Sequence, residues 1–117
     1  MPWYELIHIE HADLDQISAE VQVPRDSPWF CGHFPDEPIL PGIAQLGMVF
    51  DAIRRLSDQK WKIAGISRVR FKQIVRPGDR LTITAKPQKG RDETFSFRVM
   101  VGRGLACSGV MALAVQT

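Results

Sequence analysis

The sequence contains few cysteines, little net charge and no long apolar run, and each shortage excludes a class of protein. Its two cysteines, Cys31 and Cys107, are too few for a disulfide framework and lack metal-type spacing, so we expect free thiols in a reducing cytoplasm and no metal. A net charge of only +2 argues against nucleic-acid binding driven by bulk charge. No apolar run approaches the ~20 residues of a membrane span. The N-terminus also lacks a basic region followed by an apolar stretch, so we predict no signal peptide and no membrane partner.

What remains is an ordinary globular composition. The 117 residues are 44% hydrophobic and 24% charged, which fits one domain over residues 1–117 with its own core. A chain of this size also benefits from burying surface against a partner.

The stretch 29–53 organises the chain. Its first half is rich in proline and glycine, which predicts a rigid, irregular loop. Pro41 suits the first turn of a helix, because its missing N–H would have no partner there. From Ile43 to Ile53 only Gln45, Gly47 and Asp51 interrupt an apolar run. A helix apolar nearly all round is a buried helix, so we expect water to be excluded from most of its sides.

Alternation of apolar and polar residues predicts strands on both sides of this helix. In chain order they cover residues 3–9, 17–23, 62–75, 81–86, 94–101 and 105–115. The apolar phase of the third strand shifts near Ser67, which predicts a bulge. The last strand has small or apolar residues on both faces, so we expect it to be covered on both sides. One helix among antiparallel hairpins predicts an α+β domain with the helix packed on a curved sheet.

Two blocks carry a resemblance to a known family. Residues 32–35 read GHFP, residues 38–42 read PILPG, and the apolar helix follows; residues 68–79 read RVRFKQIVRPGD. In order and spacing these blocks resemble the hot-dog-fold 3-hydroxyacyl-(acyl carrier protein) dehydratases, over nearly the whole chain. The resemblance implies the hot-dog fold, an antiparallel sheet wrapped around one central helix, and usually a dimer.

His33 is the first candidate catalytic residue. Dehydration of a 3-hydroxyacyl thioester needs a base for a C2 proton and an acid for the leaving hydroxyl. Imidazole suits both transfers because its pKa lies near neutral pH. A lone histidine in a small domain is more often structural or exposed, but the resemblance implies a catalytic role here.

Gly42 is the second candidate. A small residue suits the tight turn into the helix, and N–H groups in the first helical turn lack internal partners. An N–H directed at a thioester carbonyl would stabilise the charge that develops in the transition state. The resemblance implies this role for Gly42. We also predict substrate contacts from Phe34, Pro41, Ile43 and Gly47.

The usual helix acid is missing. Related dehydratases carry a glutamate or aspartate at the position of Gly47, and combine the histidine of one subunit with the acid of the other. Asp51, one turn further along, could serve as the acid if burial raised its pKa. Alternatively, Asp51 marks where the helix begins to meet solvent, or it pairs with Arg54 or Arg55.

Charged residues suggest a docking surface. Arg68, Arg70 and Lys72 are expected on one strand face, with Arg76 and Arg80 nearby. These residues are either solvated or recognise an acidic carrier protein. We therefore predict a cofactor-free 3-hydroxyacyl dehydratase, or a subunit of one, that acts on carrier-linked acyl groups as a homodimer or a heterodimer with another hot-dog subunit. The alternatives are a non-catalytic subunit that binds acyl thioesters and a hot-dog thioesterase.

Overall fold

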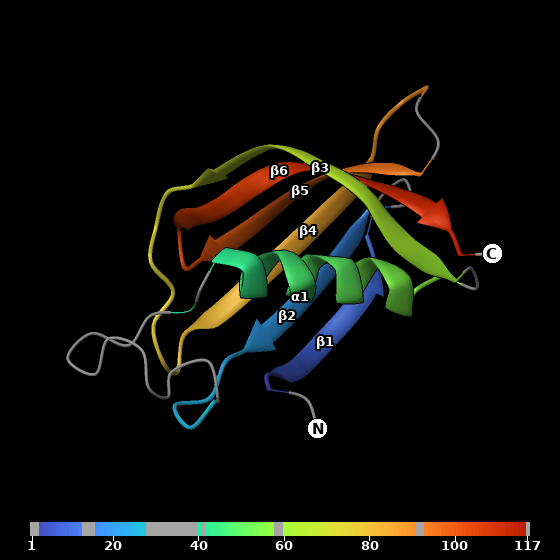
Figure 1. Cartoon of the computed structure of the whole chain (residues 1–117). Helices are drawn as coiled ribbons and strands as arrows, with labels where there is room; N and C mark the ends of the chain where they lie inside the picture. The colour runs from blue at the N-terminus through green and yellow to red at the C-terminus, as the bar shows by residue number, and fades with distance from the viewer. Residues whose placement is uncertain are drawn as a thin grey trace.

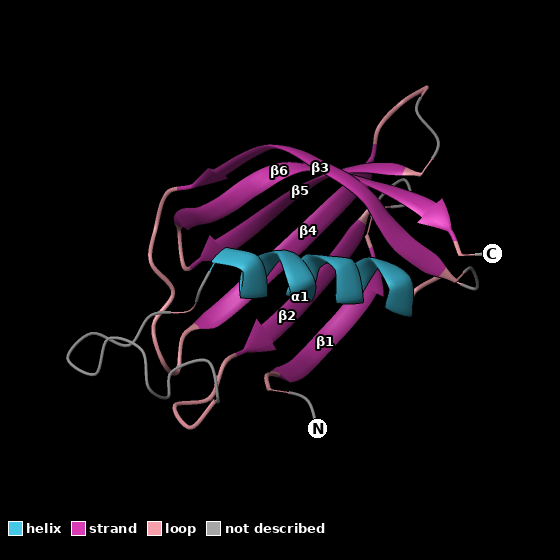
Figure 2. Ribbon diagram, in the orientation of Figure 1, coloured by secondary structure: helices cyan, strands magenta, loops and turns pink. Residues whose placement is uncertain are grey.

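The computed structural model describes residues 3–12, 16–27, 40, 42–57, 60–90 and 93–116. Six strands and one helix follow one another in these ranges (Figures 1 and 2). The elements are β1 (Glu5–His11), β2 (Ile17–Gln22), α1 (Gly42–Arg55), β3 (Trp61–Phe71), β4 (Arg80–Pro87), β5 (Thr94–Val101) and β6 (Gly104–Val115).

The strands form one antiparallel sheet in the order β1-β2-β4-β5-β6-β3. The sheet is curved, and α1 lies across its inner face (Figure 1). The predicted α+β architecture, an antiparallel sheet wrapped around one central helix, is confirmed. Because β3 follows the helix and pairs with β6, the sheet ends on β1 at one edge and on β3 at the other.

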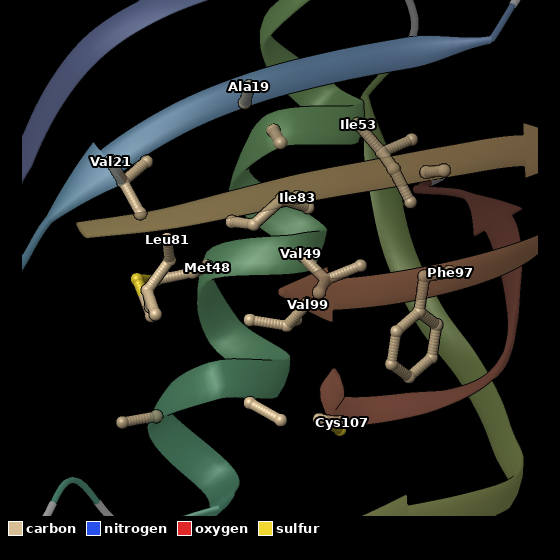
Figure 3. Packing of buried hydrophobic residues seen from close by; sticks show 14 of the residues in the cluster. Ala19, Val21, Met48, Val49, Ile53, Leu81, Ile83, Phe97, Val99 and Cys107 are labelled. Carbon is tan, nitrogen blue, oxygen red and sulfur yellow. The ribbon is translucent and has the colours of Figure 1, made fainter. Parts of the chain in front are cut away.

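The core lies between α1 and the sheet. Strands β2 and β4 alternate strictly, so every second side chain faces the helix and the others face outward. Met48, Val49 and Ile53 project from α1 onto the sheet residues (Figure 3). On β6, Gly109 lies opposite Phe97, and a Cβ there would come within 2.8 Å of the phenyl ring. A larger residue at position 109 would therefore displace the buried Phe97 ring.

Strand β3 departs from its predicted extent. The expected bulge near Ser67 is present: the pairing with β6 shifts between Ser67 and Arg70, and Arg68 has a φ of 55°. The strand ends at Phe71 instead of residue 75, however. The N–H groups of Lys72 and Gln73 both donate to the carbonyl of Ala106, which bends the chain out of the ladder.

The observed ends of β1 and β2 differ less from the predicted ones. β1 begins at Glu5 instead of residue 3, because the chain bends at Trp3 and Tyr4 before pairing starts. β2 stops at Gln22, and the Val23 N–H donates instead to the carbonyl of Asp79. The predicted turn at Pro77–Gly78 is present, with a φ of 85° at Gly78.

The helix is not buried nearly all round, so that prediction is wrong for this chain. Its buried residues lie toward the sheet, whereas Ile43 is 72% exposed and Gly47 is also exposed. A single sheet covers only one side of a helix. The apolar residues of the outward side therefore remain open in the isolated chain.

Strand β6 is flanked by β5 and β3. Its inner face, with Met111 and Leu113, is buried. On its outer face Val110, Ala112 and Ala114 are only half-buried, so the expectation that both faces are covered is not met within one chain.

Candidate functional site

The structure describes four of the predicted site residues, all on α1: Gly42, Ile43, Gly47 and Asp51. His33, Phe34 and Pro41 lie outside the described residues. The α1 residues can therefore be examined geometrically, whereas the roles of His33, Phe34 and Pro41 remain predictions.

Gly42 begins the helix directly beside the end of β3. A Cβ on Gly42 would lie 2.6 Å from the ring of Phe71, so this position admits no larger residue unless the ring moves. Just before the helix, the Leu40 N–H donates to the carbonyl of Val75 at 2.8 Å. The helix start is thus held against the connection between β3 and β4, and its first-turn N–H groups have no partner within the helix.

A cavity of about 570 Å³, here called the Gly47 pocket, lies on the outward face of α1. Three predicted site residues, Ile43, Gly47 and Asp51, line it together, whereas Gly42 does not. A Cβ at Gly47 would meet nothing within 4 Å. Thus Gly47, the position at which the family resemblance predicts an acid, opens onto empty space. The other lining residues are Trp3, Tyr4, Ala44, Phe50, Arg54 and Arg55.

Asp51 is the centre of a polar network at one end of this pocket. The Tyr4 hydroxyl donates to Asp51 Oδ2, Arg55 Nε donates to the same oxygen at 3.0 Å, and Arg54 contacts Oδ1 at 2.9 Å. The Asp51 side chain is only 14% exposed. The expected pairing with the two arginines is therefore present, together with a tyrosine that the sequence did not point to.

This network determines the charge of Asp51. Burial alone would raise the pKa of its carboxyl, but the hydrogen bonds from Tyr4, Arg55 and Arg54 outweigh burial and hold that pKa below its ordinary value. Conversely, burial and the bond to Asp51 raise the pKa of Tyr4 above its ordinary value. Near neutral pH the pair consists of a carboxylate and a neutral phenol. As placed here, Asp51 accepts hydrogen bonds and has no proton to give.

Sequence reasoning missed the N-terminal wall of the pocket. Trp3 and Tyr4 precede β1 and contact each other edge to face, with ring centroids 4.8 Å apart. The Tyr4 hydroxyl reaches Asp51 on α1, which lies 47 positions further along the chain. The available signal was that this is the chain's one tyrosine, beside a tryptophan ahead of the first strand.

The basic residues do not form one strand face as predicted. Arg68 lies in the bulge and Lys72 lies past the end of β3, which breaks the alternation on which that prediction rested. Arg70 instead shares a row with Arg98, because both pair with Ser108 from opposite sides. Arg80 is partly neutralised by Glu20 at 3.3 Å.

Cysteine and acidic side chains in the described ranges form no further reactive cluster. Cys107 is a free, buried thiol, and burial raises its pKa to about 11. Across those ranges no group of three or more histidine, cysteine, aspartate or glutamate residues could hold a metal ion. Nor is any helix among them long and apolar enough to cross a membrane.

Comparison with known proteins places this arrangement in a class. A curved antiparallel sheet around one helix defines a hot-dog domain, and the family model of the ApeI-like dehydratases (ApeI dehydratase) matches residues 9–110. The chain belongs to this dehydratase family, so the family predicted from the two sequence blocks is confirmed.

Two curated relatives are 3-hydroxyacyl-[acyl-carrier-protein] dehydratases named FabZ. The protein from Streptococcus suis is 35% identical over 112 residues, covering 86% of this chain and 79% of its own length. The protein from Polynucleobacter asymbioticus is 33% identical over 102 residues, covering 78% of this chain and 66% of its own length. The chain is thus a homologue of these enzymes, and the matches span 66% and 79% of their lengths.

Solved structures show the same fold. The dehydratase heterocomplex ApeI:P from Xenorhabdus doucetiae matches with a TM-score of 0.82 and 27% identity, over 93% of this chain and 96% of that chain. An uncharacterised protein from Erwinia carotovora subsp. atroseptica matches with a TM-score of 0.76 and 29% identity, over 96% of both chains. The fluoroacetyl-CoA-specific thioesterase FlK, at 18% identity and a TM-score of 0.65, shares the fold alone.

Proposed function

We propose that this chain is the histidine-bearing subunit of a 3-hydroxyacyl-(acyl carrier protein) dehydratase. The observation that carries the proposal is Gly47, which opens onto a pocket at the place where related dehydratases have their acid. The family membership supplies the reaction, and the missing acid assigns this chain one half of the site.

In the proposed reaction His33 removes a proton from C2 of the acyl thioester. The electron pair of the broken C–H bond forms the C2–C3 double bond, and the C3–O bond breaks. A general acid protonates the leaving hydroxyl, which departs as water. The Gly42 N–H stabilises the enolate-like charge on the thioester oxygen, as expected for a donor in the first turn of a helix. Phe34, Pro41, Ile43 and Gly47 would contact the acyl group.

The acid comes from a partner subunit in this proposal. Asp51 is the alternative within this chain, but its hydrogen bonds with Tyr4 and both arginines favour the carboxylate. To donate a proton it would first have to lose part of this network. The match to a chain of a dehydratase heterocomplex supports pairing with a second subunit, and we propose that this subunit has the hot-dog fold and carries the acid.

Two open surfaces support a paired assembly, homodimeric or heterodimeric. β3 is an edge strand, and most of its residues are exposed, including Ile63, Ile66 and Phe71. An edge of this length leaves backbone N–H and C=O groups available for another strand. The exposed Ile43 on α1 adds apolar surface that a partner would cover.

The carrier protein would dock on the basic residues near the β3 end of the sheet. Arg70 and Arg98 pair with Ser108 from opposite sides. Arg68 and Lys72 are exposed and are each two positions from Arg70 in the sequence. An acidic carrier would be steered toward these cations. We also propose that the chain is cytoplasmic, because free thiols stay reduced in that compartment. Cell fractionation tests this location.

The test separates three outcomes in one assay. The chain, alone and with a candidate partner subunit, is incubated with a 3-hydroxyacyl thioester while enoyl product and free thiol are followed separately. Enoyl product in the presence of the partner supports the proposal. Release of thiol instead would make the chain a thioesterase. Binding without either product would make it a non-catalytic acyl-thioester-binding subunit.

A further inference from the structure

The outer face of the sheet, which is turned away from α1, carries polar side chains at its centre (Figure 1). In the middle of β4 and β5 alternate residues are buried in the core, so Thr84 and Lys86 on β4 and Ser96 and Arg98 on β5 project from the outer face. The register places Thr84 opposite Arg98 and Lys86 opposite Ser96. The four side chains therefore form a square with the two cations on one diagonal.

A cavity of about 300 Å³, here called the Lys86 pocket, lies at this square. Its lining residues are Gln16, Thr84, Lys86, Ser96 and Arg98. The volume is at the lower end of the range of small-molecule sites, so the cavity suits a compact ligand. It shares no residue with the Gly47 pocket, which lies on the outward face of α1.

The lining of the Lys86 pocket consists of hydrogen-bond donors. Each of the five side chains can donate, and none of them is a carboxylate. The Ser96 hydroxyl oxygen already accepts a hydrogen bond from Gln88 Nε2 at 3.0 Å, so its own O–H can donate to a ligand. A lysine ammonium adds three N–H donors and an arginine guanidinium five. Such a lining favours a ligand with several acceptor oxygens.

The two cations of the pocket have no ion-pair partner among the residues that the structure describes. Glu20, an acid on the neighbouring strand β2, contacts Arg80 instead, at 3.3 Å. Diagonal neighbours across two strands lie about 7–8 Å apart, so Lys86 and Arg98 repel each other and can both reach an anion between them. The lining residues carry two positive charges, which a dianion would balance.

We infer that the Lys86 pocket binds a phosphate dianion, either inorganic phosphate or the phosphate monoester of a small metabolite. A phosphate monoester carries a charge of about −1.5 to −2 near pH 7 and presents three strong acceptor oxygens. The Arg98 guanidinium would bind two of these oxygens in its fork, and the Lys86 ammonium would approach from the opposite corner. The hydroxyls of Thr84 and Ser96 would donate to the remaining acceptor positions.

This site goes beyond the proposed function, because it uses the face of the sheet that is turned away from α1. Arg98 is the one residue that it shares with the surface proposed for the carrier protein. Lys86, Thr84, Ser96 and Gln16 belong to the pocket alone.

Calorimetric titration of the full chain at constant ionic strength tests the ligand class. Inorganic phosphate should bind about tenfold more tightly than acetate, which offers one charge and two oxygens. Glycerol 3-phosphate, with glycerol as its control, distinguishes the two sources of the dianion. Tighter binding than inorganic phosphate supports a phosphorylated metabolite, and equal or weaker binding supports the free ion. Equal affinity for phosphate and acetate, or no binding of either phosphate compound, would overturn the inference.

Variants test the location. Lys86→Gln and Arg98→Gln should each weaken phosphate binding about threefold to tenfold, since each removes a charged donor. Arg70→Gln is the matched control, because Arg70 pairs with Ser108 as Arg98 does but does not line the pocket. It should leave the affinity for phosphate unchanged. An equal loss in Arg70→Gln and Arg98→Gln would mean attraction by the general charge of the surface, and unchanged binding by folded Lys86→Gln would also contradict the site.

The phosphate experiment and the dehydration assay fail independently. Phosphate binding is measured on the chain alone, without a thioester or a partner subunit. Absence of phosphate binding would therefore leave the proposed dehydratase reaction standing, and absence of enoyl product would leave the phosphate site standing.

Discussion

The two faces of α1 have the same backbone and different surroundings. Toward the sheet, Met48, Val49 and Ile53 are at most 1% exposed and fill the core (Figure 3). Away from the sheet, Ile43, Gly47 and Asp51 line an open pocket. The inward face is packed within one chain, whereas the outward face has exposed apolar surface, an aspartate paired with two arginines and no carboxyl at position 47. The inward face therefore serves the packing of this chain, whereas the outward face is the one to which we assign the proposed chemistry.

The largest expected effect comes from His33, in the stretch of sequence that precedes the helix. His33→Ala should lower dehydration by about 10²–10⁴-fold or more, because the proposed base is removed. The melting temperature should stay nearly unchanged, because the proposal gives His33 a role in chemistry and none in packing. Turnover of the variant is measured with the acid-bearing partner present. Wild-type turnover in His33→Ala would remove His33 from the proposed site.

The inward face should respond in stability. Met48→Ala should lower the free energy of unfolding by about 2–5 kcal/mol, because it leaves a cavity between α1 and the sheet. Ile43→Ala on the outward face is the matched control, and its cost should stay within about 0.5 kcal/mol in the isolated chain. Urea denaturation of both variants makes the comparison. Equal losses would mean that the two faces are equally buried in solution.

A partner should cover the outward surfaces. We predict at least a dimer at micromolar concentration, because β3 leaves an open edge and exposes Ile63 and Ile66. Light scattering measures the mass directly. A monomer, alone and in the presence of a candidate partner, would contradict this prediction.

The smallest expected effect concerns Asp51. Its pKa lies below the ordinary 3.8 in the folded chain, so its ion pairs stabilise the fold above about pH 4 and are lost as the pH falls through the folded value. The pairs involve exposed arginines, so the contribution is about 1 kcal/mol at most. Asp51→Asn should remove it and flatten the acid limb of the stability curve, measured by thermal unfolding between pH 2 and 7. An unchanged acid limb would show that the network does not hold in solution.

Local patterns predicted most of the fold. Strict alternation along residues 17–22 and 80–87 identifies β2 and β4, because every second residue faces the helix. The shift near Ser67 identified the bulge in β3. The end of β3 could not be predicted, since it depends on the Ala106 carbonyl, which comes from a distant strand.

The candidate site was predictable only in part. The position of Gly47 followed from the family resemblance, but the Tyr4–Asp51 contact links segments that no local pattern connects. The burial of α1 was overestimated because Ile43, Leu46 and Phe50 are typical of a core helix and of a face that binds a partner. Sequence periodicity does not distinguish these two situations, whereas the single covering sheet does.

The most direct test of the central claim restores an acid to the outward face. Gly47→Glu places a carboxyl where the family resemblance predicts one, and a Cβ at this position meets nothing within 4 Å. The enoyl-forming rate of the isolated chain should rise by about 10²–10⁴-fold, the usual contribution of general acid catalysis, while Asp51→Asn leaves the wild-type rate unchanged. If Gly47→Glu folds, binds the thioester and stays inactive, and no acid-bearing partner activates the wild type, the chain is not half of a dehydratase site.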